Sequence, residues 1–352
     1  MSENPIKGRG AQSNVKNKFL KREFVNEHLE GIDEAFEENP KTTYFIDHPK
    51  KIINKLDSPD LRGMYSMNPY QGCEHGCIYC YARNSHTYYG FSAGIDFEQK
   101  ILVKVNAAKV LEESFDNKKW EPIPVMLAGN TDIYQPAERK FKITRQLLEV
   151  FLKYKHPVSI ITKNSLVLRD IDLLTELSKL NLLHVSISIT SLNEATRLAL
   201  EPRTATAKQR LKAVTELSKA GILVNVMIAP IIPSINCHEI PEIMKQIADA
   251  GALSAAYTMV RLNGQIGEIF TDWIHKAYPD RAERVLNQIK EVHGGTLNDS
   301  RYGYRMTGEG KIAESIQRLF KISKDKYLKD RIYPALSMEH FKRPEKGQLS
   351  MF

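Results

Sequence analysis

Short apolar runs alternate with amphipathic stretches along most of the chain after about residue 100. The runs are PVMLAGN (124–130), VSIITKN (158–164), HVSISIT (184–190), ILVNVMIAP (222–230) and AAYTMVRL (255–262). They are nearly continuous and rich in β-branched residues, which is typical of strands in a parallel sheet that is covered on both faces. Their starts recur at the spacing of βα units. The pattern therefore predicts an α/β fold.

The stretches between the runs show helical periodicity. Leu211, Val214 and Leu217, for example, fall on one face of such a stretch. An earlier strand is expected near residues 64–69, and KILVKV (100–105) is a further candidate. About six βα units then favour an incomplete (β/α) barrel, although a doubly wound sheet would give the same pattern.

The pattern divides the chain into four parts. They are a basic N-terminal extension (1–60), the barrel (61–265), a helical C-terminal extension (266–346) and a short tail (347–352). The first 22 residues carry six Lys and Arg against one acid, which predicts a loose basic arm or a solvated tail. The C-terminal extension is predicted to form two helices interrupted near Pro279, followed by a third.

Composition and charge narrow the class of protein. Apolar residues make up 42% and charged residues 26% of the 352 residues, as in an ordinary globular protein. No run approaches the ~18 apolar residues of a membrane-spanning helix. The first residues lack the apolar core of a signal peptide, so we expect a cytoplasmic protein. The net charge of +8 permits a polyanionic partner such as nucleic acid.

The strongest chemical signal is NPYQGCEHGCIYCYAR, which holds three of the four cysteines. Cys73, Cys77 and Cys80 follow a C-x-x-x-C-x-x-C spacing, and three thiolates on one loop can coordinate three irons of a 4Fe–4S cluster. The fourth iron would then be open to a substrate or cofactor. A zinc site with His75 as fourth ligand, and free structural cysteines, are the alternatives.

This spacing, with Tyr79 just before the last cysteine, resembles the radical S-adenosylmethionine (SAM) superfamily. The resemblance implies a partial (β/α)6 TIM-like barrel of the radical SAM type, with its site at the carboxyl ends of the strands. It also implies that a 4Fe–4S cluster binds SAM. One electron, from a donor such as flavodoxin or ferredoxin, would cleave SAM to methionine and a 5′-deoxyadenosyl radical that abstracts hydrogen from the substrate.

Residues 60–262 resemble one branch of that superfamily, which contains spore photoproduct lyase and proteins usually labelled DNA repair photolyases. The resemblance implies that strand-end residues contact the cofactor. These are Tyr79 beside the adenine, Asn130 and Thr131 near SAM, Lys163 at the SAM carboxylate, Ser188, and Ala229 near the adenine. Arg203 would pair either with the SAM carboxylate or with acids of its own loop, and Tyr81 would lie near the radical path.

One position departs from the branch. Where spore photoproduct lyases carry a cysteine that returns hydrogen to the product radical, this chain has Gly129. Cys237, in a loop after the fifth strand of the barrel, either replaces that thiol or is a bystander. We therefore predict Tyr81 and Cys237 as catalytic residues, and repair of the spore thymine dimer by the thiol route is not expected.

The preferred function is a radical SAM enzyme that acts on DNA in a repair-like reaction. The alternatives are a radical SAM enzyme that modifies a protein side chain or small metabolite, and a non-enzymatic cluster or zinc protein that binds nucleic acid. The last five residues, from Gln348 to Phe352, resemble the bacterial sliding-clamp binding peptide, which implies the clamp as a partner. A C-terminus folded back on the barrel is the other interpretation.

Overall fold

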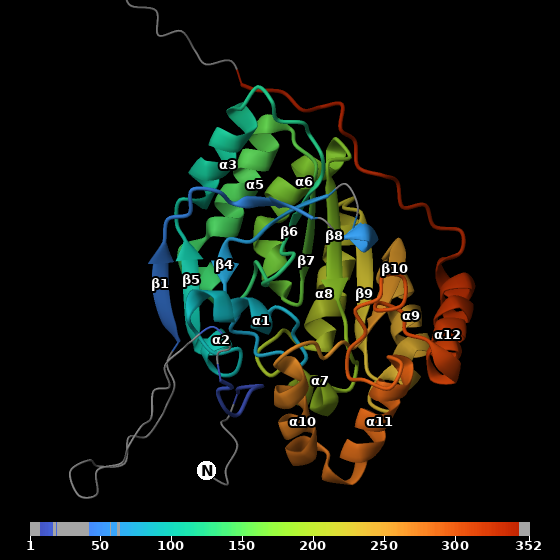
Figure 1. Ribbon diagram of the computed structural model, residues 1–352. Coiled ribbons are helices and arrows are strands. Elements are labelled where there is room, and N and C mark those ends of the chain that lie inside the picture. Colours follow the sequence, from blue (N-terminus) through green and yellow to red (C-terminus); the bar gives the residue numbers. More distant parts are fainter. Residues whose placement is uncertain (1–7, 17–18, 20–41, 57, 62–63, 345–352) are drawn as a thin grey trace, which may run out of the picture.

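The main element of the protein is a largely parallel sheet (Figure 1). The computed structural model describes residues 8–16, 19, 42–56, 58–61 and 64–344. Within these residues one seven-stranded sheet has the order β10-β9-β8-β7-β6-β3-β2. Its strands are β2 (Ile53–Lys55), β3 (Tyr65–Met67), β6 (Val125–Leu127), β7 (Val158–Thr162), β8 (Leu183–Ser188), β9 (Val224–Ile231) and β10 (Ser254–Met259). The strands from β3 to β10 run parallel, and β2 pairs with β3 antiparallel at one edge.

The order of the strands decides between the two α/β architectures. From β3 to β10, each strand of this sheet lies beside the one that precedes it along the chain. A doubly wound sheet reverses its strand order at a switch point, so that alternative is wrong. The sheet does not close, because β10 and β2 lie at its two ends. This arrangement agrees with the partial barrel predicted from the sequence.

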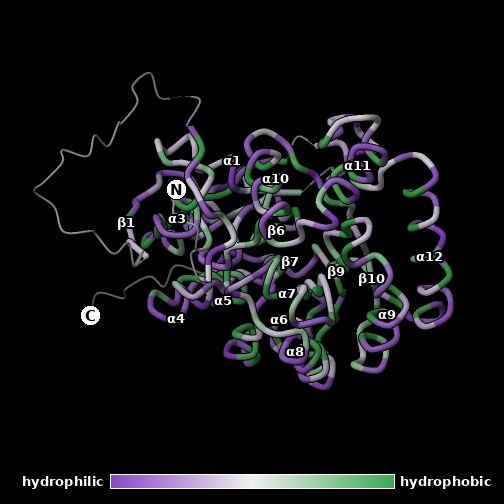
Figure 2. Tube along the Cα trace, turned by 90° about the horizontal axis from the view of Figure 1, so that it is seen from below, coloured by the Kyte–Doolittle hydropathy of each residue, from purple (hydrophilic) through white to green (hydrophobic). Residues whose placement is uncertain are grey.

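Helices cover the outer face of the sheet, as the amphipathic stretches predict, and Figure 2 shows α5, α6, α8 and α9 in an arc around the strands. On α8, Val214 and Leu217 are completely buried. Within the described residues, no helix has the length and apolar character needed to span a bilayer. The α-helices are α1 (Arg83–His86), α2 (Asp96–Gln99), α3 (Ala107–Asp116), α4 (Ala137–Phe141), α5 (Ile143–Tyr154), α6 (Ile171–Lys179), α7 (Glu194–Leu200), α8 (Ala207–Lys219), α9 (Ile240–Asp249), α10 (Ile266–Ala277), α11 (Ala282–Val292) and α12 (Gly310–Leu328).

The KILVKV segment forms a strand, as predicted, but in a second sheet. This strand, β5 (Lys100–Lys104), lies between β1 (Thr43–Asp47) and β4 (Tyr70–Gln71), parallel to the first and antiparallel to the second. Because β4 leads directly into Cys73, the small sheet holds one end of the cysteine-containing loop. The position of β1 also shows that part of the basic N-terminal extension belongs to the folded protein.

Three helices follow β10 in the region predicted as the C-terminal extension. α10 and α11 are separated at Pro279, as predicted, and α12 follows. The tail at 347–352, and with it the predicted clamp-binding peptide, lies outside the described residues.

Residues 329–344, which we call the C-terminal belt, run back from α12 across the amino ends of the strands (Figure 1). His184 Nε2, at the start of β8, donates to the Pro334 carbonyl (2.8 Å). Arg343 Nε donates to the Phe115 carbonyl at the end of α3 (2.9 Å). The belt therefore joins the two sides of a sheet that does not close by itself.

His156 is buried where the belt meets the helices. Its ring stacks on Phe115 at 4.3 Å between ring centres, and Phe341 of the belt packs against it edge-on at 5.5 Å. Trp120 Nε1 donates to His156 Nε2 (3.1 Å), so the neutral ring is the form that accepts this bond. Burial lowers the pKa of His156 from 6.5 to about 4.

We expect His156 to make the protein less stable in acid. Between pH 6.5 and about 4 the unfolded chain protonates this ring and the folded chain does not, so stability is complete above pH 6.5 and falls as the pH falls. The loss from this group is at most about 3 kcal/mol. Urea unfolding at neutral and acid pH should show a smaller loss for His156→Gln, which keeps an acceptor for Trp120. The exposed-residue control His48→Gln should show the wild-type loss, and equal losses in all three proteins would contradict this assignment.

Candidate functional site

Polar side chains from neighbouring strand ends meet at the carboxyl edge of the sheet. Asp132, in the loop after β6, accepts hydrogen bonds from the Thr162 hydroxyl (2.7 Å) and the Lys163 backbone N–H (2.8 Å). Thr190, just after β8, donates to the Ala229 carbonyl on β9 (2.9 Å). These hydrogen bonds link the loop after β6 to the end of β7, and the end of β8 to β9, so the floor of the site is rigid.

The cysteine loop, residues 72–82, is a buried segment that contacts this edge. The Cys73 N–H donates to the Phe97 carbonyl on α2 (2.8 Å). Cys73 and Cys77 are buried and Cys80 is partly exposed, and all three carry free thiols. The loop thus presents three thiols within a few residues of one another.

The donor set suits a 4Fe–4S cluster better than a single zinc ion. Among the described residues, no three His, Cys, Asp or Glu side chains converge as a zinc site needs. A 4Fe–4S cluster places each thiolate on a different iron, so its ligands do not have to converge on one ion. Burial and the charge of Glu201 raise the pKa of the Cys77 thiol, and the neighbouring cysteines raise it further. Bound iron cations would offset this accumulated negative charge.

His75 is already engaged by other residues and does not complete a zinc site. Its Nδ1 lies 3.3 Å from Asp132 Oδ2, and its Nε2 lies 3.3 Å from Asn164 Nδ2. Burial would lower the pKa of His75, but Asp132 and Cys73 raise it to about 10. For Asp132 the signs are reversed: burial alone would raise the pKa of the carboxyl, but the charge of His75 lowers it to about 2. This ion pair joins the cysteine loop to the end of β6.

Tyr79 is held by a buried charge network. Its hydroxyl donates to Glu201, whose other carboxylate oxygen pairs with Arg210. Burial would raise the pKa of Glu201, but Arg210 and Lys163 lower it to about 2. Tyr79 is only 8% exposed, so its ring is fixed as one wall of the site.

Lys163 is a cation beside this wall. Its Nζ lies 5.9 Å from the centre of the Tyr79 ring, and none of the described residues forms an ion pair with it. Its charge acts on the Cys77 and Cys80 thiols. Because Glu201 is paired with Arg210, the charge of Lys163 is available to an anionic group near the cysteines.

Thr131 and Asn130 lie at the edge of the site and make hydrogen bonds within the protein. Thr131 Oγ1 donates to the Tyr70 carbonyl (2.8 Å), and Asn130 Nδ2 donates to Ser85 Oγ (2.9 Å). The Thr131 hydroxyl can therefore only accept a hydrogen bond from a ligand. Contact of these two residues with SAM stays a prediction.

Ser188 and Ala229 lie on adjacent strands, as the sequence predicts, whereas Arg203 lies against the cysteine loop. Ser188 is buried near the end of β8, and the Ala229 carbonyl already accepts a hydrogen bond. Arg203 Nη2 is 3.6 Å from Glu74 Oε1, and its backbone N–H donates to the His75 carbonyl (3.2 Å). Arg203 thus pairs with an acid of the cysteine loop, not with one of its own loop.

The two predicted catalytic residues lie in different places. Tyr81 is 58% exposed, and its hydroxyl donates to the carbonyl of Gly129, the position at which this chain lacks the expected cysteine. Cys237 lines a cavity of about 360 Å³ together with Lys311 and Ser315 of α12. None of the predicted cofactor residues lines that cavity. The structure brings Tyr81 to the site and does not bring Cys237 there.

Residues 8–15, which we call the N-terminal strap, pack on the cysteine loop. The expectation of a loose arm is therefore wrong for this segment. Ala11 is completely buried, and the backbone N–H groups of Gly10 and Ala11 donate to the Glu98 carboxylate (3.1 and 2.8 Å). A Cβ at Gly10 would lie 1.8 Å from the Gly76 carbonyl oxygen, so only glycine fits this contact.

Glu98 and Arg83 connect the strap to the cysteines. Arg83 Nη2 pairs with Glu98 Oε1 (2.6 Å), and Arg83 Nε donates to the Cys77 carbonyl (3.0 Å). Both charged side chains are completely buried. Sequence reasoning missed this pair because most Arg and Glu residues are exposed, and no pattern marks the exceptions.

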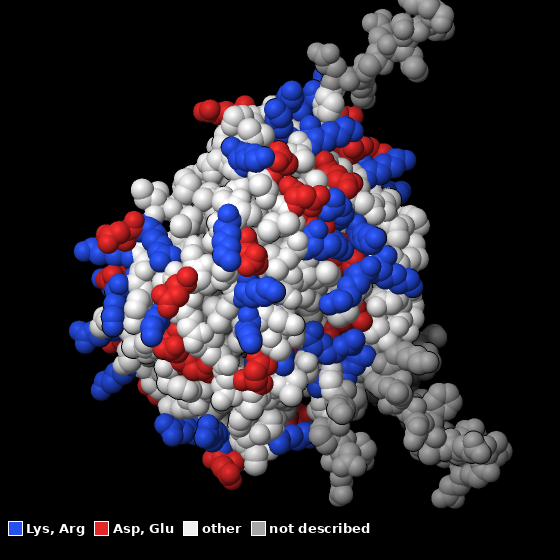
Figure 3. All heavy atoms as spheres, turned by 180° about the vertical axis from the view of Figure 1, so that it is seen from behind, with Lys and Arg blue, Asp and Glu red and all other residues white. Residues whose placement is uncertain are grey.

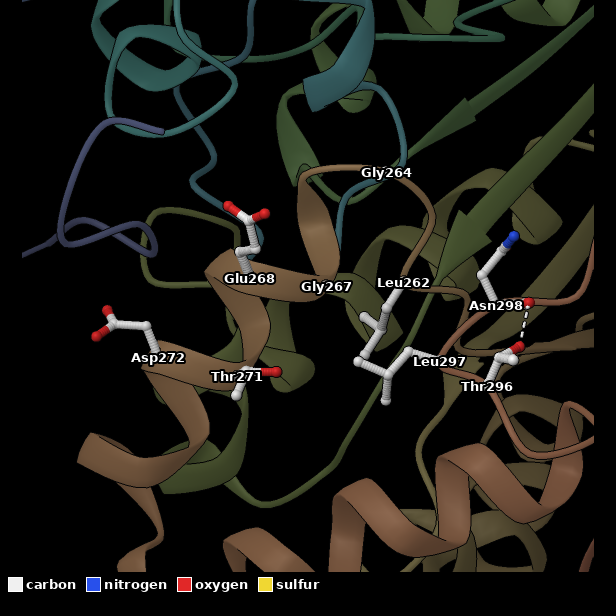
Figure 4. Close-up of a pocket in the computed structure, with 9 residues that line it drawn as sticks. All are labelled: Leu262, Gly264, Gly267, Glu268, Thr271, Asp272, Thr296, Leu297 and Asn298. Atoms are coloured by element: carbon white, nitrogen blue, oxygen red, sulfur yellow. Dashed lines mark hydrogen bonds between the residues drawn. The ribbon is translucent and has the colours of Figure 1, made fainter. Parts of the chain in front are cut away.

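A cavity of about 730 Å³ opens beside the helix that follows the cysteine loop (Figure 4). Asn84, on α1, donates through Nδ2 to the Asn263 carbonyl in its rim (2.8 Å). Glu268 and Asp272 project from α10 and make the cavity acidic. The sequence analysis did not predict this cavity. The lining residues are Leu262, Gly264, Gly267, Glu268, Thr271, Asp272, Thr296, Leu297 and Asn298.

Comparison with solved structures shows which proteins share this fold. A spore photoproduct lyase complexed with dinucleoside spore photoproduct matches with a TM-score of 0.60 and 17% identity, over 85% of both chains. A variant of that lyase with bound AdoMet and dinucleoside spore photoproduct matches with a TM-score of 0.57 and 16% identity, again over 85% of both chains. At this level of identity the likeness shows a shared fold.

Comparison of sequences shows the family. The model of the radical SAM superfamily matches residues 67–247. An uncharacterized protein of Mycobacterium tuberculosis (strain ATCC 25618 / H37Rv) is 32% identical over 238 residues, 67% of this chain and 70% of that protein. An uncharacterized protein of Methanocaldococcus jannaschii is 28% identical over 68% of this chain and 85% of its own. The cysteine motif, the strand order and these matches agree, and the chain belongs to the radical SAM superfamily, whose enzymes use a 4Fe–4S cluster and SAM.

Proposed function

We propose that this chain is a radical SAM enzyme in which Cys73, Cys77 and Cys80 hold a 4Fe–4S cluster. The observation that supports this most strongly is the buried cysteine loop beside Lys163, which has no ion-pair partner among the described residues. When bound, the cluster would supply the electron that cleaves SAM. A donor of the flavodoxin or ferredoxin type would reduce it, in a reducing compartment such as the cytoplasm.

The residues of the chain would orient SAM. We assign Lys163 to the SAM carboxylate, because a charge-assisted hydrogen bond would satisfy both groups. Tyr79, fixed by Glu201, would form the wall beside the adenine. Tyr81, on the exposed side, would lie between SAM and the substrate. Further contacts to SAM are proposed for Asn130, Thr131, Ser188 and Ala229.

We further propose that the substrate is DNA. The net charge of +8 favours a polyanion, and the spore photoproduct lyase with the same fold was solved with a dinucleoside spore photoproduct. Figure 3 shows Lys and Arg spread among Asp and Glu over one face of the molecule, so the surplus of positive charge is not gathered into one patch on that face. Because Gly129 and the position of Cys237 leave no thiol at the site among the residues described apart from the cysteine loop, the reaction would not use the thiol route.

One experiment tests the proposed function. The protein is reconstituted anaerobically and incubated with SAM and dithionite, together with untreated or ultraviolet-irradiated DNA. Mass spectrometry should detect 5′-deoxyadenosine and an altered nucleoside that depends on DNA. If SAM is cleaved and no nucleoside is altered, DNA is not the substrate, and a protein side chain or a small metabolite is tested next. A protein that takes up one zinc and no iron would contradict the enzyme proposal.

Removal of the Lys163 charge should weaken SAM binding. For Lys163→Ala we expect a loss of about 1.5–3 kcal/mol in SAM binding, the usual worth of a hydrogen bond to a charged group. Anaerobic calorimetry measures the affinity, and the iron content should equal that of the wild type. The control is Lys179→Ala, which removes a lysine from the surface pair with Glu176 on α6. Equal SAM affinity in both variants would rule out the assigned role of Lys163.

A further inference from the structure

Arg261 is a partly buried residue at the carboxyl edge of the sheet, just after β10. The backbone on both sides of it is fixed. The Val260 N–H donates to the Ile231 carbonyl (3.0 Å). The Leu262 N–H donates to the Leu297 carbonyl (3.1 Å). The backbone of Arg261 is therefore held at this edge of the sheet.

Arg261 has no carboxylate partner among the residues that the structure describes. Its Nη1 contacts the Met306 sulfur at 3.7 Å, and its Nε is buried without a hydrogen-bond partner. Asp60 and Asp299 attract its charge, but each is already paired with another arginine. The charge of Arg261 is therefore not neutralised within the described part of the chain.

A second cation, Arg305, further destabilises the unpaired charge of Arg261. Burial lowers the pKa of Arg261, and the charge of Arg305 lowers it further. A partly buried cation without a partner destabilises the folded protein, and an anionic ligand would remove that cost. Residues that break a stability rule in this way are expected at functional sites.

The surroundings of Arg261 indicate which ligand supplies the anion. The loop that follows Arg261 contacts α1, the helix that follows Tyr81, because Asn84 Nδ2 donates to the Asn263 carbonyl (2.8 Å). Lys163, assigned to the SAM carboxylate, follows β7, and two strands separate β7 from β10 in the sheet. Nearby, Tyr302 is 54% exposed, and the Arg305 guanidinium lies 4.3 Å from the centre of its ring. Exposed aromatic rings beside arginines are suited to stacked bases.

We propose that Arg261 binds a phosphodiester group of the substrate strand, at a subsite separate from the SAM site. The guanidinium offers several N–H donors to phosphate oxygens, and Arg261 is partly exposed, so a strand can reach it. The inference rests on the proposed DNA substrate and goes beyond it, because it names the residue that holds the strand beside Tyr81.

The test is the binding of a fluorescent single-stranded oligonucleotide to the reconstituted, SAM-loaded protein at several salt concentrations. Arg261→Gln should weaken binding about tenfold at low salt and lower the slope of log affinity against log salt by about 0.7, the value for one phosphate on a single strand. Arg261→Lys should restore the slope, since the charge returns. The control is Lys118→Gln, an exposed lysine before β6 at the amino end of that strand, which should behave as wild type.

The outcomes separate the two proposals. If Arg261→Gln binds the oligonucleotide with the wild-type affinity and slope, the Arg261 subsite is wrong and DNA remains the substrate. If the wild type itself binds no oligonucleotide at any salt, both the DNA substrate and the subsite are wrong, and an anionic peptide becomes the next ligand to test. Iron content and melting temperature of each variant show that a change in binding is not a failure to fold.

Discussion

Replacing Cys77 with alanine should abolish both the 4Fe–4S cluster and the cleavage of SAM. The superfamily cluster has three cysteine ligands, and this chain has three cysteines in the loop and no spare thiol near it among the described residues. Cys73→Ala and Cys80→Ala should give the same result. Iron and sulfide analysis after anaerobic reconstitution, and chromatography of 5′-deoxyadenosine, measure the two losses.

Cys237→Ala is the matched control for this experiment. Cys237 lines a separate cavity, so its loss should leave the iron content and SAM cleavage at the wild-type level. A cluster that assembles fully in Cys77→Ala would show that another residue is the ligand. If Cys237→Ala cleaves SAM normally but forms no product on DNA, the Cys237 thiol takes part in the reaction.

Replacing Glu98 with alanine should give the largest loss of stability. Arg83 would keep its buried charge without a partner, and the N–H groups of Gly10 and Ala11 would lose their acceptor. Breaking a buried ion pair by removing one partner costs about 3–5 kcal/mol. Urea unfolding of the reconstituted protein measures the loss.

Two further variants define the effect of Glu98. Glu98→Gln keeps a hydrogen-bond acceptor for the strap and should be less damaging than Glu98→Ala. Glu216→Ala, which removes the exposed partner of Lys219 on α8, should cost about 0–1 kcal/mol. If Glu98→Ala is no worse than Glu216→Ala, the strap does not depend on this pair.

The strands of the barrel could be predicted because burial on both faces leaves a signal in the sequence. Each of the five apolar runs overlaps one strand from β6 to β10, and the run near residue 65 contains β3. The partner of a strand leaves no such signal. KILVKV was recognised as a strand, but its pairing with β1 and β4 depends on contacts that periodicity does not encode.

The cysteine motif was predictable for a different reason. Three thiolates must lie on one short loop to reach one cluster, so the requirement is local in sequence. The network around Tyr79 is not local, since Glu201 lies 122 residues away along the chain. Arg261 is equally invisible from the sequence, where an arginine after an apolar strand gives no sign that it lacks a partner.

The strap and the belt were missed because neither has a periodic apolar face. The strap is held by hydrogen bonds to Glu98 and by the burial of Ala11, and the belt by hydrogen bonds and by the packing of Phe341, so neither segment shows the periodicity that predicts a helix or a strand. Their glycines and arginines match the composition of solvated tails. The prediction of a loose basic arm followed from that composition, and the burial of Ala11 overturned it.

Because of the belt, the fold can be completed only at a late stage of protein synthesis. Its Arg343 donates to the Phe115 carbonyl, 228 residues earlier in the chain, and every strand of the described residues precedes the belt. Contacts so distant in sequence form late in folding. A chain that leaves the ribosome with the barrel finished but the belt missing would expose the rings of Phe115 and His156. Such a chain would be a target for chaperones and proteases, so premature termination within this polar segment should lower the amount of enzyme in the cell even though every proposed site residue has been made.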